Sequence, residues 1–345
     1  MATLAAIIVS WNTRDLLGRC VETIHASLDG SGIAYTIVVV DNASSDGTPE
    51  MLRAEHPEIT LIEAGRNLGF AGGNNLALRR VLSSESLVLS TNSARSSKLK
   101  AQNSKLDYVL LLNPDTEVVG DAIPRLVRYL DAHPDVAVAG PRLRYPGGSV
   151  QPSRRRFPTR AVYFWESTPL EQRWPGNPWA RRYRCADVPD DVEQEVDWLV
   201  GAALLVRRDA IARAGLLDAG FAMYSEELEW QRRIGQQSAV SGQQSASQLA
   251  AGCRRIVYLP DAGIIHHEGK SSEQAPARRY LNFQRSRIRE AGMIYGPRFA
   301  AALRLFLRAA YSAELASEAA KWLVGHKREL RTRRVVVYWQ VVRGL

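Results

Sequence analysis

The feature that most constrains this chain is an unbroken apolar run that ends in a sharp polar turn. Residues 108–112 (YVLLL) are followed directly by Asn113, Pro114 and Asp115. A short apolar run bounded by a turn signal predicts a buried β-strand, which must end at Pro114 because proline has no N–H to donate. Asp115 is therefore expected at the carboxyl end of a strand, the edge at which open α/β sheets bind ligands. Asn-Pro-Asp is also ordinary turn chemistry, so the assignment depends on the rest of the chain.

Similar apolar runs alternate with segments of helical periodicity. The strands are predicted at residues 4–9, 36–40, 59–63, 108–112, 136–140, 196–206 and 256–259, and the helices at 13–26, 48–54, 74–82, 120–133 and 209–214. Strand–helix–strand alternation with short connections predicts an α/β fold with a mainly parallel, Rossmann-like sheet flanked by helices. Polar turns follow several of these strands, so we expect polar side chains to gather along one edge of the sheet.

Three segments interrupt this rhythm. Residues 83–105 and 235–251 are low-complexity stretches rich in serine and other small or polar residues, and we interpret both as mobile surface insertions. Residues 141–195 are rich in proline, arginine and aromatic residues without a clear period, which is typical of a functional loop or lid. We therefore predict an α/β domain over residues 1–277 and a basic, amphipathic helical tail over residues 278–345.

The positive charge of the chain is concentrated in that tail. The whole chain carries a net charge of +9, yet Lys and Arg outnumber Asp and Glu by 15 to 4 in residues 278–345 and stand at 30 to 32 before them. Helical periodicity runs through residues 278–292 and 298–325, and basic residues flank an apolar stretch at 335–342. Basic side chains interleaved with apolar ones fit a helix lying in an anionic membrane surface. A helical cap with a solvated basic face fits almost equally well.

Cysteine usage and the first residues indicate the compartment. The three cysteines are odd in number and widely spaced, which argues against a disulfide framework or a cysteine zinc site and favours a reducing environment. The N-terminal sequence MATLAAIIVSWN lacks a basic region and is predicted to form the first strand, and no run of 18 apolar residues could span a membrane. The expected location is cytoplasmic, with possible peripheral contact at the inner face of the plasma membrane.

Five separated segments then match one known pattern in the expected order. They are IVSWN at 8–12, VVVDNASSDGT at 38–48, RNLGFAGGNN at 66–75, LLLNPDT at 110–116, and GAALLVRRD with YSEELEWQRR at 201–209 and 224–233. The sequence resembles glycosyltransferase family 2, inverting enzymes of the GT-A fold, and especially bacterial rhamnosyltransferase-type members of cell-surface polysaccharide pathways. The resemblance covers about residues 4–295 and is specific as a set.

The resemblance implies a nucleotide-sugar site along the strand ends. Asp41 corresponds to the acid that contacts the base or ribose, although a helix-capping turn residue is the structural alternative. The other positions implied to bind the nucleotide sugar are Ser10, Asn12, Arg66, Asn67, Gly72, Asn74 and Asn113. Glycine in the segment from Arg66 to Asn74 permits close approach of the backbone. The implied donor is a dTDP- or UDP-sugar.

The resemblance also implies a divalent cation, Mg²⁺ or Mn²⁺, on the donor diphosphate. Asn113 and Asp115 stand where the family has its Asp-x-Asp motif, with asparagine replacing the first aspartate, so Asp115 is the expected ligand. His266 matches a late histidine of the family and is a second candidate ligand. His267 is adjacent, and the sequence does not distinguish the two. Surface or core histidines are the alternative reading.

A catalytic base is implied by the Glu226-Glu227 pair, which stands where the family has Glu-Asp. The second member, Glu227, would take the proton from the attacking hydroxyl, since a hydroxyl is a poor nucleophile without a positioned base. A metal neutralises the departing diphosphate, so no protein acid is needed, and direct displacement at the anomeric carbon inverts its configuration. Trp198 and Gly201 match the block that shapes the acceptor side. A solvated acidic helix start and plain core packing are the structural alternatives for the glutamates and Trp198.

We therefore predict an inverting, metal-dependent glycosyltransferase that moves a hexose or deoxyhexose to a glycan or polyprenyl-linked acceptor. A non-catalytic nucleotide- or nucleic-acid-binding protein on the same fold is an alternative, but no nucleic-acid module is recognisable and no nucleic-acid partner is expected. A nucleotidyltransferase is a further alternative, although residues 10–13 do not form its usual glycine-rich phosphate loop. The sequence leaves open the sugar, the base, the acceptor hydroxyl and the oligomeric state.

Overall fold

The computed structural model describes residues 1–83, 106–221, 223–236, 255–269 and 276–345. The predicted low-complexity segments lie almost entirely outside these ranges. The chain forms two compact units: the first comprises Met1–Arg155, Pro189–Ala219 and Glu227–Ser271, and the second comprises Arg156–Val188, Gly220–Glu226 and Ser272–Leu345. The second unit thus includes two segments upstream of the predicted tail, and each unit is described by itself below.

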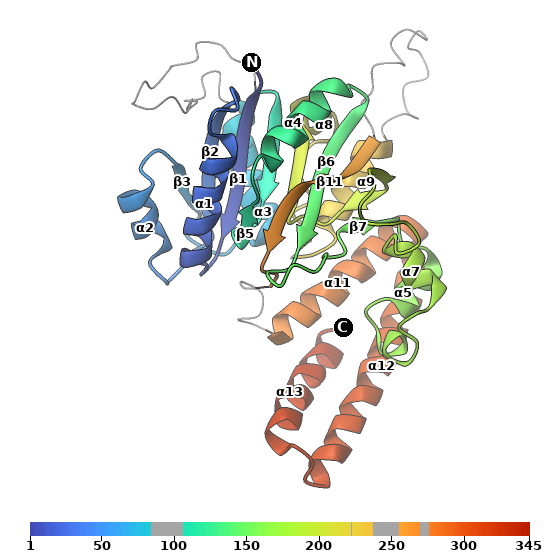
Figure 1. Ribbon diagram of the computed structural model, residues 1–345. Coiled ribbons are helices and arrows are strands. Elements are labelled where there is room, and N and C mark those ends of the chain that lie inside the picture. The colour runs from blue at the N-terminus through green and yellow to red at the C-terminus, as the bar shows by residue number, and fades with distance from the viewer. Residues whose placement is uncertain (84–105, 222, 237–254, 270–275) are drawn as a thin grey trace. The chain divides into compact units, whose positions relative to one another are not determined.

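The first unit is built on a nine-stranded mixed sheet (Figure 1). Its strands, in spatial order, are β3 (Thr60–Glu63), β2 (Ala34–Asp41), β1 (Thr3–Ser10), β4 (Tyr108–Leu112), β10 (Ala203–Arg207), β6 (Val136–Arg144), β11 (Arg255–His266) and β5 (Thr116–Val118), with β8 (Gln194–Val196) also paired to β11. The strands from β3 to β4 are parallel, as are β6 and β11, whereas β10 runs antiparallel between β4 and β6. This arrangement confirms the predicted α/β class.

Helices cover both faces of the sheet. On one face α1 (Arg14–Leu28), α2 (Thr48–Glu55) and α4 (Ala122–Ala132) pack their apolar residues against alternate residues of β1, β2 and β4 in a single core. On the other face lies α3 (Gly69–Ser83), which approaches β1 so closely that a Cβ on Gly73 would meet Val9 Cγ1 at 2.6 Å. β1 and β4 are buried on both faces, which explains why their sequences are continuously apolar.

Two element boundaries differ from the prediction. α3 begins at Gly69 rather than near residue 74, because Gly69 adopts a φ of 72° that suits glycine and Asn67 Oδ1 accepts its N–H at 2.9 Å. The last strand was predicted to end at 259, before Pro260, but β11 continues to His266. Its ladder with β6 shifts register between Leu259 and Gly263, so the proline falls at an irregularity where no N–H is required.

Residues 141–195 contain more regular structure than their composition suggested. They form the end of β6, β7 (Arg154–Arg155), the short helices α5 (Arg160–Trp165), α6 (Pro169–Arg173) and α7 (Pro178–Tyr183), and the start of β8. α6 and α7 each begin with proline after a capping side chain: Thr168 accepts from Leu170 N, and Asn177 accepts from Ala180 N. The predicted strand 196–206 is divided among β8, β9 (Trp198–Leu199) and β10.

The second unit contains the helices α11 (Pro276–Tyr295), α12 (Pro297–Leu323) and α13 (Arg328–Gly344). Leu303 and Leu307 of α12 are fully buried in its apolar core together with Val341 of α13. The apolar stripe that suggested a membrane helix is therefore used, in part, to hold the helices together. None of the helices in the described ranges has both the length and the apolar character required to cross a membrane.

A buried ion pair joins the two halves of the α12–α13 hairpin. Glu318 is 2% exposed and accepts from Arg331 Nη1 at 2.5 Å, while Lys321 Nζ lies 3.1 Å from its other oxygen. Removal of Glu318 would leave the buried Arg331 guanidinium without its carboxylate, so this pair helps to fix how α13 packs on α12.

Candidate functional site

The site predicted from the sequence lies where β1, β2 and β4 end. Ser10 pairs with Asp41 across β1 and β2, so the two side chains start from neighbouring positions of the same edge. The loops that follow are tied together, because Asn12 Oδ1 accepts the Ser45 N–H at 2.8 Å and Ser44 Oγ accepts the Asn12 N–H at 3.0 Å. Ser10 and Asn12 therefore shape this edge through bonds within it.

Asp41 carries the clearest sign of a missing ligand at this edge. Its side chain is 3% exposed, and Oδ2 accepts the Ser44 N–H at 3.1 Å. Among the described residues, Oδ1 is buried without a hydrogen-bond partner. Buried carboxylate oxygens are normally satisfied, so an unused acceptor here fits a donor group supplied by a ligand.

The glycine-rich segment serves mainly to place α3 against the edge. Arg66 and Asn67 are exposed, and a Cβ on Gly72 would lie 2.9 Å from Leu68 Cβ. Asn74 is buried, and its amide donates to the Phe70 carbonyl at 2.9 Å within the helix. Arg66 and Asn67 thus remain accessible to a ligand, whereas Gly72 and Asn74 act through packing and helix structure.

Asp115 and His266 come together from opposite ends of the chain. β11 pairs with β5 so that His266 faces Thr116, and His266 Nε2 lies 3.3 Å from Asp115 Oδ1. The Asn113 amide nitrogen is also 3.3 Å from the same ring nitrogen. Both Asp115 and His266 are about 95% buried. Three of the side chains named from the sequence therefore converge on one point.

His267 points to a different partner. Its Nε2 lies 2.7 Å from Glu117 Oε1, while its backbone N–H donates to the Asp115 carbonyl. Successive residues of a strand face opposite sides, so only one of the two histidines can meet Asp115. In this structure that residue is His266.

The donor set at Asp115 fits a divalent cation. Gln151 Oε1, which can only accept, lies 2.9 Å from His266 Nδ1, so the proton belongs on Nδ1. Nε2 then carries the lone pair of the ring, and it lies 3.3 Å from both the Asn113 amide nitrogen and Asp115 Oδ1. A ring-nitrogen lone pair and a carboxylate oxygen are both acceptors, so this pair is better explained as two ligands of Mn²⁺ or Mg²⁺ than as a direct contact. Gln151 is the kind of outer partner that orients metal-binding histidines.

Glu227 is held by the start of α9 (Glu226–Gln236). The buried Gln231, one turn later, accepts the Leu199 N–H at 2.9 Å and donates to the Leu199 carbonyl at 2.7 Å, which fastens the helix to β9. A Cβ on Gly201 would lie 3.4 Å from the Glu227 side chain and 3.4 Å from Phe70. Glycine at 201 therefore lets Glu227 and the segment before α3 approach each other.

Glu227 lies on the same edge of the sheet as Asp115. The Asn113 N–H donates to the carbonyl of Ala202 at 2.9 Å, and Ala202 follows the Gly201 that contacts Glu227. Glu226, the other member of the pair, is buried at the first position of α9, whereas Glu227 is half-buried. Glu227 is thus the better placed of the two to reach a substrate.

Burial raises the pKa of the Glu227 carboxyl above its ordinary value. A hydrogen bond from the Gly201 backbone and the charge of Arg155 lower this pKa in part without cancelling the effect. Arg155 also stacks over the ring of Trp198, which is 6% exposed, with 5.9 Å between guanidinium and ring centroid. Trp198 is therefore held by packing and by Arg155 with little of its own surface free, and its role on the acceptor side stays a prediction.

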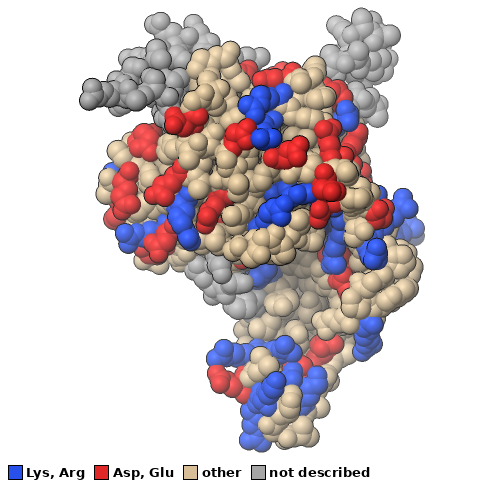
Figure 2. Space-filling model, in the orientation of Figure 1, with Lys and Arg blue, Asp and Glu red and all other residues tan. Residues whose placement is uncertain are grey.

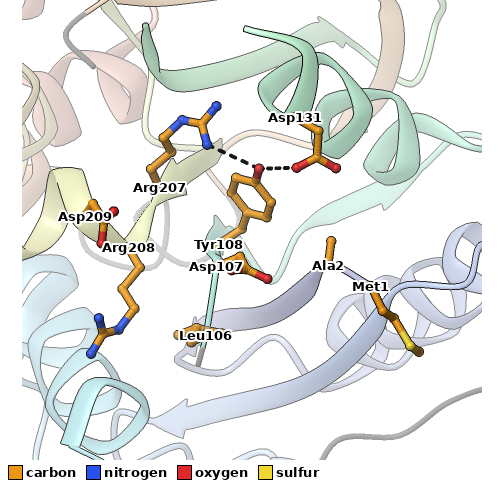
Figure 3. A pocket seen from close by; sticks show the side chains of 9 residues that line it. All are labelled: Met1, Ala2, Leu106, Asp107, Tyr108, Asp131, Arg207, Arg208 and Asp209. Carbon is orange, nitrogen blue, oxygen red and sulfur yellow. Dashed lines mark hydrogen bonds between the residues drawn. The ribbon is translucent and has the colours of Figure 1, made fainter. Parts of the chain in front are cut away.

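The cavity drawn in Figure 3 lies at the other end of β4. It has a volume of about 440 Å³ and is lined by Tyr108, the first residue of that strand, with Asp131 and Arg207 beside it. Tyr108 donates to Asp131, and Arg207 donates to Tyr108 and to the His133 carbonyl at the end of α4. These groups satisfy one another and cap a helix, which is a structural arrangement.

Sequence reasoning missed several residues that position the site. Gln151 orients His266, and Gln231 fixes α9. Asn42 joins the turn after β2 to the glycine-rich segment: its side-chain amide donates to Gly69 O at 3.2 Å, and its side-chain carbonyl accepts from Leu68 N at 3.3 Å. Asn42 stands beside Asp41, and Gln231 is one helical turn from Glu227, so spacing could have suggested both. Nothing in the sequence connects Gln151 with His266.

We predict that Glu227→Gln stabilises the fold at neutral and alkaline pH. Because the folded-state pKa of Glu227 is raised, the folded protein binds this proton more tightly than the unfolded chain, and ionisation costs stability as pH rises from the ordinary glutamate value to the raised one. The amide removes that cost, so the melting temperature of E227Q should exceed that of the wild type at pH 8, and the gap should shrink toward pH 4. The exposed Glu55→Gln serves as the control, and an unchanged or lower melting temperature for E227Q at pH 8 would contradict the assignment.

Comparison with known proteins agrees with this arrangement. Residues 5–89 match the family described as glycosyl transferase family 2. The chain is 29% identical over 242 residues to an N-acetylglucosaminyl-diphospho-decaprenol L-rhamnosyltransferase of Mycobacterium tuberculosis, covering 70% of this chain and 69% of that protein. It is 27% identical to the low-salt glycan biosynthesis hexosyltransferase Agl10 of Haloferax volcanii, covering 70% and 64% of the two chains.

A solved structure shows the same fold at lower identity. It is a mannosyltransferase of Pyrobaculum calidifontis in complex with GDP-Man and Mn²⁺, with a TM-score of 0.51, 18% identity, and coverage of 99% of this chain and 86% of that one. Together with the sheet order, these comparisons show an α/β chain with the GT-A fold that is similar to glycosyltransferases of family 2, including an L-rhamnosyltransferase.

Proposed function

We propose that this enzyme transfers a sugar from a nucleoside diphosphate to a hydroxyl of a glycan or lipid-linked acceptor, with inversion at the anomeric carbon. The observation that carries the proposal is the presence of two different chemical groups on one edge of the sheet. Asp115 and His266 form a cation-binding pair, and Glu227 is a half-buried carboxylate joined to them through Asn113 and Gly201.

The donor binds where β1 and β2 end. The unused Oδ1 of Asp41 would accept from the base or ribose, while Arg66 and Asn67 are accessible on the same edge. Asp115 and His266 would hold Mg²⁺ or Mn²⁺, which neutralises the charge of the departing diphosphate. The M. tuberculosis relative is named as an L-rhamnosyltransferase, which favours a dTDP- or UDP-linked deoxyhexose as donor.

Glu227 serves as the base. A carboxylate whose pKa is raised by burial holds a proton more strongly than an ordinary glutamate, so it is better suited to take the proton of an attacking hydroxyl. The acceptor oxygen then attacks the anomeric carbon from the side opposite the diphosphate, and the configuration inverts. Glu226 lies beside it and is too buried to reach the hydroxyl directly, so it acts as a positioning residue.

Two substitutions should separate cation binding from base catalysis. We expect Asp115→Ala and His266→Ala to lose Mn²⁺-dependent binding of dTDP- and UDP-sugars, because each removes a cation ligand, whereas His267→Ala should keep it. Glu227→Gln should retain donor binding and lose transfer by about 10²- to 10⁴-fold, the usual contribution of a positioned base. Donor binding is measured by calorimetry with and without Mn²⁺, and transfer by product formation.

The converse pattern would contradict these assignments. Equal loss of donor binding in the His266 and His267 variants would reject the cation pair. Full transfer activity in E227Q would reject the base. A screen that includes GDP-sugars distinguishes a wrong donor from a wrong site, since binding of any one donor should depend on Asp115.

The α12–α13 hairpin supports contact with a lipid-linked acceptor. The end of the hairpin exposes Trp322, Leu323 and Val324, of which Leu323 is 70% and Val324 81% exposed. Lys327 and Arg328 follow at once, and the Arg328 guanidinium lies 5.6 Å from the centroid of the Trp322 ring. Figure 2 shows Lys and Arg side chains gathered over this hairpin, with uncharged surface and a few acidic side chains among them. We propose that this end binds the anionic inner leaflet, where polyprenyl-linked acceptors are presented.

The double variant Leu323→Asp/Val324→Asp should weaken binding to vesicles of phosphatidylcholine and phosphatidylglycerol by about tenfold or more, because it removes apolar insertion and adds negative charge. Leu305→Asp is the matched control, since Leu305 is 71% exposed on the same helix but away from the turn. Co-sedimentation measures both. Equal binding by the double variant and the control would contradict a membrane role for this end.

A further inference from the structure

A second cluster of metal-binding side chains lies at the other end of the sheet. His25 is in the last turn of α1, His56 ends α2, and Glu58 stands just before β3. One potential ligand atom from each lies within 4.8 Å of the other two. β1 leads into α1 at the catalytic edge, and α1 runs back toward the start of β2, so this cluster and Asp115 occupy opposite edges of the first unit.

The spacing of the three ligand atoms suits one ion. Glu58 Oε1 is 3.1 Å from His25 Nε2 and 3.6 Å from His56 Nδ1. Ligands at Zn²⁺ bond lengths of about 2.0–2.1 Å in tetrahedral geometry are separated by roughly 3.3 Å. The two observed separations bracket that value, and the third, between the two histidine nitrogens, is no more than 4.8 Å. Two histidines and one carboxylate leave a fourth position for water.

Outer contacts hold two of the ligands in place. The hydroxyl of Tyr35, a residue only 1% exposed, lies 2.7 Å from His25 Nδ1, which leaves Nε2 directed at Glu58. A partner on the second ring nitrogen is the usual way in which a metal-binding histidine is oriented. The His56 backbone donates to Leu52 O at 3.0 Å and accepts from Ile59 N at 3.1 Å. His56 is therefore fixed relative to α2 and to the strand that follows.

The site is also open to an ion from solvent. The side-chain exposures are 26% for His25, 12% for His56 and 42% for Glu58. Arg53, on the preceding turn, is paired with Glu63, so its charge is directed to another carboxylate. An ion from solvent can therefore reach the three ligand atoms with the backbone as it stands.

From this geometry we propose that His25, His56 and Glu58 bind Zn²⁺ at a site separate from the nucleotide-sugar site. Two imidazoles beside a single carboxylate favour Zn²⁺, whereas the catalytic edge offers one imidazole and must accept a cation that also binds diphosphate. The ion would link the end of α1, the end of α2 and the start of β3. These elements adjoin β2, which ends at Asp41, and β3, which leads to Arg66, so Zn²⁺ would stabilise the part of the first unit that carries the donor site.

The test is a Zn²⁺ titration of the full-length chain against a chromophoric chelator. It is done in an Asp115→Asn background, so that the catalytic edge does not contribute. We expect one bound ion, and His25→Gln, His56→Gln and Glu58→Gln should each weaken binding by more than tenfold. Tyr35→Phe should weaken it by about tenfold, the lower end of the loss when an outer partner of a histidine ligand is removed. His133→Gln changes the histidine that directly follows α4, outside the cluster; it is the control and should bind like the parent.

A second measurement keeps the test valid if a variant folds poorly. Co²⁺ added to the parent protein should give the visible absorption of a four-coordinate site, and Zn²⁺ should displace it and raise the melting temperature. Equal Zn²⁺ affinity in the His56 and His133 variants, or Co²⁺ spectra of a fully hydrated ion, would overturn the proposal. In that case Glu58 only pairs electrostatically with the two histidines.

Discussion

The structure depends on the register of three parallel strands that end together. β2, β1 and β4 are paired so that Ser10 meets Asp41 and Ile8 meets Leu112, and each strand is buried on both faces by helices. Main-chain hydrogen bonds fix where every following turn begins. A slip of one residue would exchange the two faces of a strand, so its side chains would no longer match the helices packed on either side. Strand pairing, and not contact between the side chains themselves, therefore brings polar residues from distant parts of the sequence to one edge.

Antiparallel neighbours complete that edge. β10 runs back along β4, and the bond from Asn113 N to Ala202 O continues the ladder past the last paired residue. This pairing brings Gly201, and with it Glu227, to the end of β4. β11 then passes its irregularity at Pro260 and reaches β5, which delivers His266 to Asp115. The proposed base thus depends on β10, which runs against the parallel strands, and the proposed cation ligands depend on β11, which runs with them and pairs antiparallel with β5.

Much of this edge could be predicted from local sequence. Buried strands such as β1 and β4 are recognisable because their apolar runs end in turn residues, and the polar residues after them were named correctly as neighbours of one edge. The continuation of β11 could not be predicted, because Pro260 is a local stop signal that pairing with β6 and β5 overrides. The choice between His266 and His267, and the part played by Gln151, required strand pairing over more than a hundred residues. The inclusion of 156–188 in the second unit also depends on tertiary packing that periodicity does not report.

The central claim is that Asp115 and His266 hold the donor's cation on the edge where Glu227 lies. The most direct measurement is anomalous scattering from crystals grown with Mn²⁺ and the nucleoside diphosphate. The account predicts a manganese peak at bonding distance, about 2.0–2.2 Å, from an Asp115 oxygen and His266 Nε2, with the diphosphate bound to the same ion. A diphosphate-bound manganese that touches neither residue, or one seated only at His25, His56 and Glu58, would contradict it.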